Sequence, residues 1–264
     1  MTFHSLTAPI SMAKVLTRVD GWPIHVANME DCVNSILKLL HDQHSFMICT
    51  LNLDHIAKLR RNSGMREAYR RAELVTADGF PIVWLAYLNG VKLNRTAGAD
   101  LVQPLCAAAS SNKIPIFLFG STFRSLRLCA TRLKRQFKQL EIAGAYSPSK
   151  NFSIGSRECD DAILTIKRSG AKLCFVALGA PLQELFSAWA MERSTGIAFL
   201  PIGGALDFLA GTQLRAPKIF QDLNLEWAWR LALNPRRFGL RYFRSMITFF
   251  ALLFESRLGE RAGG

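Results

Sequence analysis

Short hydrophobic runs flanked by turn-forming residues recur along the chain, with amphipathic stretches between them. Such runs are typical of strands buried in a parallel sheet. We predict six strands, at 46–52, 74–77, 114–120, 141–146, 172–179 and 197–203. Helical spacing predicts helices over 30–42, 100–111, 121–139, 159–169 and 182–193. Because strands and helices alternate, we expect an α/β fold with a Rossmann-like, mostly parallel sheet and helices on both faces.

The sequence changes character after Gly211, where basic and aromatic residues begin to alternate. We therefore divide the chain into an α/β core at 1–211 and a basic, aromatic-rich helical appendage at 212–264. The most apolar stretch of the appendage, 245–254, is ten residues long. A membrane-spanning helix needs about 20 apolar residues, so this stretch can lie on a membrane but not cross one.

The amino-acid composition indicates which classes of molecule the protein binds. Half of the 264 residues are hydrophobic, which is enough for a sizeable core. The 33 Lys and Arg residues outnumber the 20 Asp and Glu residues and give a net charge of +13. We therefore expect an anionic partner, which is nucleic acid, a phospholipid surface or a phosphorylated small molecule.

The cysteines and the N-terminal segment predict a cytoplasmic protein. The six cysteines are scattered singly, without a C-x-x-C pair or a Cys/His cluster at zinc spacing, and most of them lie in apolar stretches as small core residues. The first 18 residues contain no uninterrupted apolar run of the kind found in secretory signals.

Polar or glycine-rich segments follow four of the predicted strands. They are 51–55 (LNLDH), 78–81 (DGFP), 179–184 (GAPLQE) and 203–208 (GGALDF). Ligands of open α/β sheets bind at the carboxyl ends of strands, so we expect these segments to share a cleft. In the last segment, Gly203 and Gly204 would let the backbone approach a phosphate.

Two readings are open for the polar residues of the first two segments. Asp78 is placed to act as a general base, or it caps the helix that begins at Phe80-Pro81. Thr50 and Asn52 are two residues apart and can face one cleft, or Asn52 and Asp54 bond to their own backbone in a turn.

The other polar candidates are equally ambiguous. Gln183 and Glu184 are either site residues or first-turn residues of a helix that begins at Pro181. Arg95 either binds a phosphate or is a solvated surface residue, and Asp100 is a candidate helix cap. His55 is more typical of a structural histidine than of a catalyst.

The arginines of the appendage also have two compatible interpretations. A basic face with Phe and Leu residues would bind anionic lipid. A cluster of guanidinium groups would neutralise a diphosphate, a task that a divalent metal often performs. The sequence contains no D-x-D triplet of the kind that holds such a metal.

An ordered series of motifs resembles the WecG/TagA/CpsF family of glycosyltransferases. The motifs are TLN, ADGFP, RTAGADL, GAPLQE, GGALDFLAG, RAP, LEWAWRL and NPRR-x3-RY, and they run from Thr50 to Tyr242. Chance is a poor explanation for eight motifs in the expected order. The family's glycine-rich turn often has Val and Phe where this chain has Ile202 and Leu206, and these changes preserve apolar character.

The resemblance implies roles for individual residues. By its ADG motif, Asp78 matches the family's proposed base, and Thr50 and Asn52 match residues that line the acceptor or sugar pocket. Arg95 and Gln183 match an arginine and a glutamine of the family's motifs. The basic positions of the C-terminal segment, which closes over the nucleotide diphosphate and contacts membrane, are Arg215, Arg230, Arg237 and Arg241.

The resemblance also implies the reaction. Family members transfer a hexose or N-acetylhexosamine-type sugar from a UDP-sugar to a polyprenyl-diphosphate-linked sugar, with inversion, on the inner face of the membrane. We expect no cofactor and no metal, and no nucleic-acid partner. The LNLDH run is closest to exopolysaccharide-pathway members and favours a neutral hexose such as glucose. Whether the chain forms a homo-oligomer stays open.

Two other functions compete with this interpretation. The α/β alternation and the glycine-rich turns also suit a nucleotide-dependent oxidoreductase, but no G-x-G-x-x-G follows the first strand. The charge of +13 suits a non-enzymatic module that binds nucleic acid or membrane, but the sequence has no named nucleic-acid-binding signature.

Overall fold

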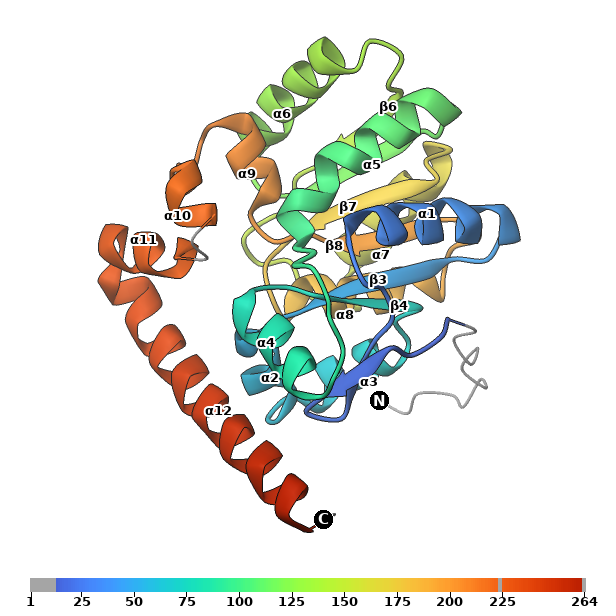
Figure 1. The fold of residues 1–264 in the computed structure, drawn as a ribbon. Helices are drawn as coiled ribbons and strands as arrows, with labels where there is room; N and C mark the ends of the chain where they lie inside the picture. Colours follow the sequence, from blue (N-terminus) through green and yellow to red (C-terminus); the bar gives the residue numbers. More distant parts are fainter. Residues whose placement is uncertain (1–12, 223–224, 263–264) are drawn as a thin grey trace.

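The computed structural model describes residues 13–222 and 225–262 (Figure 1). Within these ranges, the structure does not describe the side chains of residues 221–222, 230, 237–238, 241 and 255–262. A six-stranded sheet in the order β4-β3-β8-β7-β5-β6 forms the centre of the molecule. Its strands are β3 (Phe46–Leu51), β4 (Leu74–Ala77), β5 (Ile116–Gly120), β6 (Ile142–Tyr146), β7 (Leu173–Ala177) and β8 (Ala198–Pro201).

The six predicted strands are all present, and every pairing within this sheet is parallel. The predicted α/β fold class is therefore confirmed. Several predicted strands extended too far at one or both ends, for example 172–179 against the observed Leu173–Ala177. The extra residues at the carboxyl ends belong to the turns that lead into the next helices, and those at the other ends belong to the loops before the strands.

Helices cover both faces of the sheet. Successive strand side chains point to opposite faces, and in β3 Met47 and Cys49 belong to one hydrophobic cluster while Phe46 and Ile48 belong to another. The helices that contribute to the first cluster are α2 (Leu53–Leu59), α3 (Ser63–Arg70), α4 (Phe80–Leu88), α7 (Arg157–Arg168), α8 (Leu182–Met191) and the C-terminal α12 (Pro235–Ala262). Those that contribute to the second are α1 (Met29–Leu39), α5 (Gly98–Asn112), α6 (Phe123–Gln136) and α9 (Ala205–Ala210).

The cysteines belong to this core, as predicted. All six are buried and free, at Cys32, Cys49, Cys106, Cys129, Cys159 and Cys174.

A small hairpin that the sequence did not predict precedes the sheet. It pairs β1 (Thr17–Val19) with β2 (Trp22–Ile24) around Asp20 and Gly21, both of which have positive φ. Strands of three residues are too short to show a periodic pattern. The residue after β2, His25, bonds to β4, because its amide donates to Val75 O and its Nδ1 accepts from Val75 N. The hairpin thus satisfies backbone groups of the edge strand.

Three helices follow the core: α10 (Lys218–Asp222), α11 (Glu226–Leu233) and α12 (Pro235–Ala262). The long helix α12 packs along α2 (Figure 1). Its buried side chains Ser245, Thr248 and Leu252 recur at helical spacing and define the side that faces the core. Among the helices in the described ranges, none combines the length and the apolar character that a bilayer span requires.

Candidate active site

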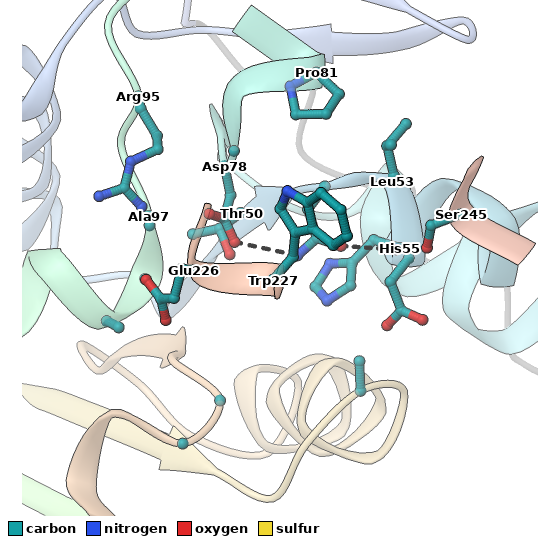
Figure 2. A pocket seen from close by; sticks show the side chains of 18 of the residues that line it. Thr50, Leu53, His55, Asp78, Pro81, Arg95, Ala97, Glu226, Trp227 and Ser245 are labelled. Carbon is teal, nitrogen blue, oxygen red and sulfur yellow. Dashed lines mark hydrogen bonds between the residues drawn. The ribbon is translucent and has the colours of Figure 1, made fainter. Parts of the chain in front are cut away.

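A pocket of about 530 Å³ lies at the carboxyl ends of β3, β4, β7 and β8 (Figure 2). This volume is within the usual range for small-molecule sites. The segments after these four strands all contribute to its wall, so the predicted convergence of strand ends is confirmed. The predicted site residues that line it are Thr50, Asn52, Asp78, Arg95, Gln183, Gly203, Gly204 and Arg215. The side chains of Arg230, Arg237 and Arg241 lie outside the described residues.

Asp78 and Asn52 are brought together by two adjacent parallel strands. The register pairs Leu51 with Ala77, and the Asp78 amide donates to Leu51 O at 2.8 Å. Each strand therefore ends at the same level, and Asn52 Nδ2 donates to Asp78 Oδ2 at 3.1 Å. The Asn52 side chain also accepts from His55 N at 2.9 Å and caps α2. Asn52 therefore bonds to the nearby backbone, as the turn interpretation held, and also lines the pocket.

Asp78 does not cap a helix. The N-cap of α4 is Gly79, which has φ of 92° and makes no side-chain cap hydrogen bond. The capping alternative for Asp78 is therefore wrong, because the positive φ of Gly79 turns the chain before the helix begins. The carboxylate lies in the pocket with Asn52 as its hydrogen-bond partner (Figure 2).

The surroundings of Asp78 shift its proton affinity. Burial raises the pKa of this carboxyl to about 6, although the Asn52 hydrogen bond and the positive charge of Arg95 act in the opposite direction. The negative charges of Glu226 and Asp100 add to the increase. A carboxyl with this pKa is mostly ionised at neutral pH, yet binds a proton more tightly than an exposed aspartate does.

Two arginines of the pocket share one carboxylate. Arg95 Nη2 donates to Asp100 Oδ2 at 2.6 Å, and Arg215 Nη2 donates to Asp100 Oδ1. Arg215 Nη2 also lies 3.8 Å from Glu226 Oε2. Arg95 is therefore not the solvated surface residue of the alternative interpretation. The expectation that Asp100 caps α5 is also wrong, because the N-cap is Ala97 and no side chain caps it.

Gln183 joins two of the glycine-rich loops. Its Oε1 accepts from Gly179 N at 3.2 Å and from Gly203 N at 3.0 Å. Its Nε2 donates to Glu184 Oε1 at 2.8 Å, which fixes the orientation of the amide. The Gly203 amide, which belongs to the turn whose backbone we expect to approach a phosphate, donates to Gln183. Gln183 and Glu184 do lie in the first turn of α8, as the structural alternative held.

A buried polar chain lies beneath the pocket. Glu184 Oε1 is 3.9 Å from His55 Nε2, and His55 Nδ1 is 2.6 Å from the Tyr69 hydroxyl. The Tyr69 hydroxyl in turn donates to Thr50 O at 3.3 Å. Burial raises the pKa of Glu184 to about 7, although the Gln183 hydrogen bond lowers it. These contacts support the interpretation of His55 as a structural residue, and they link Glu184 to the strand that carries Thr50.

A glycine at the start of α5 lets this helix approach the end of β8 closely at the pocket. Gly98 begins this helix, and a Cβ at this position would lie 3.2 Å from Ile202 Cα and from Pro201 O. A side chain there would therefore press against the end of β8. This close approach explains the glycine of the RTAGADL segment, which brings Arg95 to one side of the pocket, where it pairs with Asp100.

The C-terminal helices complete the wall. Glu226 and Trp227 of α11 face the strand ends, and Ser245 of α12 lies beside His55 in the same view (Figure 2). Other α12 side chains that line the pocket are Tyr242, Met246 and Phe249. The sequence marked this segment as basic and aromatic but did not single out Glu226 or Met246, because nothing local shows that they face a distant cleft.

A comparison with known proteins identifies the family. A model of the glycosyl transferase WecG/TagA/CpsF family matches residues 17–263. The chain belongs to this family. WecG/TagA/CpsF membership makes it a glycosyltransferase of cell-surface polysaccharide synthesis, with a sugar-nucleotide donor and a lipid-linked acceptor in general. Neither the oxidoreductase nor the non-enzymatic binding module fits this assignment.

The contact between Asn52 and Asp78 predicts a measurable pKa change. Replacing Asn52 with Ala removes a hydrogen bond that stabilises the ionised carboxylate, so the pKa of Asp78 should rise by roughly one unit. Carboxyl-carbon NMR titration of the two proteins measures it. Asn62→Ala is the matched control, because Asn62 caps α3 in the same way and has no contact with Asp78. Equal titration in all three proteins would contradict the assigned contact.

The position of Gln183 predicts a cost in stability. Gln183→Met keeps a side chain of similar volume but leaves the Gly179 and Gly203 amides without their acceptor. We expect the free energy of unfolding to fall by about 2–4 kcal/mol in urea denaturation. Gln136→Met, in the last turn of α6, is a control for the loss of a polar amide. A Gln183→Met protein within about 0.5 kcal/mol of the wild type would show that the two loops do not depend on this side chain.

Proposed function

We propose that the chain is an inverting, metal-independent glycosyltransferase. It moves a hexose or N-acetylhexosamine-type sugar from a UDP-sugar to a polyprenyl-diphosphate-linked sugar in bacterial surface or exopolysaccharide biosynthesis. The observation that carries the proposal is a carboxylate with a pKa of about 6 in the pocket of a protein from a glycosyltransferase family.

Asp78 acts as the general base. A side chain whose pKa lies just below the working pH is ionised often enough to accept a proton and basic enough to remove one. The hydroxyl of the acceptor gives its proton to Asp78 while its oxygen attacks the anomeric carbon. The bond from that carbon to the diphosphate oxygen breaks on the opposite face, and UDP leaves with the electron pair. A single displacement of this kind inverts the anomeric configuration.

Neighbouring side chains hold the base and the sugar in place. Asn52 fixes Asp78 through its amide and is itself fixed by the start of α2. Thr50 lines the same wall and is buried at the end of β3. We assign both to the sugar or acceptor side of the pocket. Gln183 acts through the loops that it joins, while Gly204 lines the pocket beside them.

The charge balance of the pocket assigns a role to the appendage. The arginines among the described lining residues are Arg95 and Arg215, and the carboxylates are Asp54, Asp78 and Glu226. Both arginines also form ion pairs with Asp100, which partly neutralises their charge. A diphosphate leaving group therefore needs additional positive charge, which we assign to Arg230, Arg237 and Arg241. In the described structure Arg215 Nε is buried without a hydrogen-bond partner and is a further donor for a phosphate oxygen.

The outward side of α12 supports a peripheral position on the inner face of the membrane. Phe243, Ile247, Phe250 and Phe254 recur at helical spacing and are exposed, while Ser245, Thr248 and Leu252 face the core. The outward side of an ordinary surface helix carries polar residues instead of such an apolar stripe. An interfacial helix buries such a stripe in the lipid headgroup region, and nearby basic residues are attracted to anionic lipid.

Removal of the base tests the proposal. With radiolabelled UDP-sugars and a short-chain polyprenyl-diphosphate-linked acceptor, Asp78→Asn should lower kcat about 10²–10⁴-fold and leave UDP affinity nearly unchanged. Wild-type transfer should persist in EDTA, because the arginines replace a metal. Asp54→Asn is the matched control, since Asp54 also lines the pocket but pairs with Lys58. Full activity of Asp78→Asn would refute the assignment of the base, and loss of activity in EDTA would refute metal independence.

A further inference from the structure

Helix α4 presents an unusual surface. None of its nine residues, FPIVWLAYL, is charged. Ile82, Leu85 and Ala86 are buried in the core, and the exposed large side chains are Phe80, Trp84, Tyr87 and Leu88. Their spacing places these four on one side of the helix. The outward side of α4 is therefore apolar and aromatic, where a surface helix normally carries polar residues.

The outward sides of α4 and α12 are connected by a series of aromatic contacts. The ring centroids of Phe80 and Trp84 are 5.8 Å apart, and those of Trp84 and Phe249 are 5.9 Å apart. Phe249 is also 6.0 Å from Phe250 on the exposed side of α12. Helix α4 lies beside α12 in the ribbon (Figure 1). We call this surface the aromatic face, which comprises Phe80, Trp84, Tyr87, Leu88, Phe243, Ile247, Phe250 and Phe254.

The aromatic face borders the pocket. The pocket is lined by Phe80 and Pro81 of α4 and by Met246 and Phe249 of α12. One residue, Gly79, separates the candidate base Asp78 from the start of α4. Figure 2 shows Asp78 and Pro81 at the same end of the pocket. Whatever covers the aromatic face therefore lies next to the acceptor hydroxyl that the base would deprotonate.

The charge of the protein indicates what covers this face. A second copy would bring two chains of net charge +13 together, with the exposed arginines Arg236 and Arg244 of α12 near the contact. Repulsion between the copies opposes that arrangement, whereas an anionic lipid surface attracts the same charges. Tryptophan and tyrosine also favour the boundary between lipid and water, where an apolar ring and a polar group are both accommodated.

We propose that α4 of the core is itself a membrane-contact element, and that it enters the headgroup region of an anionic phospholipid bilayer beside α12. The proposal rests on the membrane association assigned to α12 under the proposed function. It extends that function, because the contact then includes the helix that follows the candidate base. The pocket would open at the bilayer surface, and a lipid-linked acceptor would reach Asp78 without leaving the membrane.

The test uses the full chain and phosphatidylglycerol–phosphatidylethanolamine vesicles in a sedimentation assay. Tyr87→Gln/Leu88→Gln removes two exposed side chains of the aromatic face that do not line the pocket. We expect vesicle affinity to fall roughly tenfold or more, from the loss of two apolar side chains at the interface. Phe123→Gln/Leu164→Gln is the matched control, with equally exposed residues on α6 and α7, and should bind as the wild type does.

A second variant separates this proposal from the one on α12. Phe250→Gln/Phe254→Gln changes only the outward side of α12. If it loses vesicle binding while Tyr87→Gln/Leu88→Gln binds normally, α4 is not a contact and the membrane role of α12 stands. If only the α4 variant loses binding, the α4 proposal stands and the assignment to α12 is wrong. Two results would overturn the α4 proposal. One is a wild-type protein that does not bind the vesicles, and the other is a wild-type dimer that Tyr87→Gln/Leu88→Gln dissociates.

Discussion

The amide of Asn52 donates a hydrogen bond to the Asp78 carboxylate at the edge where two parallel strands end. The carboxylate is partly withdrawn from water, and burial alone would favour its neutral form more strongly than the observed surroundings do. Asn52 holds its orientation because its own oxygen caps α2, so the position of the Asp78 carboxylate is tied to the start of a helix. This contact depends on three features, which are the register of β3 and β4, the turn at Gly79 and the cap of α2.

The opposite wall of the pocket depends on a different constraint. Gln183 binds the amides of two loops that follow neighbouring strands, and Glu184 fixes the direction of its amide. The pocket thus has two preorganised walls, one with a carboxylate and one with tied backbone loops. Helices α11 and α12 close it with aromatic side chains such as Trp227 and Phe249. Walls of this kind reduce the access of water to the pocket and strengthen the electrostatic interactions within it.

Much of the fold and part of the site could be predicted from local sequence. Buried strands such as 74–77 are mainly apolar runs that a polar residue follows. Because parallel strands bring their ends together, the cleft around Thr50, Asn52 and Asp78 could be predicted from the pattern alone. Family motifs then supplied roles for these residues. Side-chain partners distant in sequence could not be predicted. Asp100 accepts a hydrogen bond from Arg215, which is 115 positions away in the sequence. Gln183 likewise accepts one from the amide of Gly203, in the turn that was expected to approach a phosphate. Such contacts depend on how elements pack, which no local pattern encodes.

The central claim is that Asp78 removes a proton from the acceptor, and the pH dependence of transfer tests it most directly. The measurement is kcat/KM from pH 4.5 to 8.5, with the sugar-nucleotide donor that supports transfer in a panel of donors. A raised pKa means that the base is protonated, and therefore inactive, below about pH 6. The predicted profile is level above pH 7 and falls about tenfold per pH unit below pH 6. A profile that stays level down to pH 5 would show that a group other than this carboxylate accepts the proton.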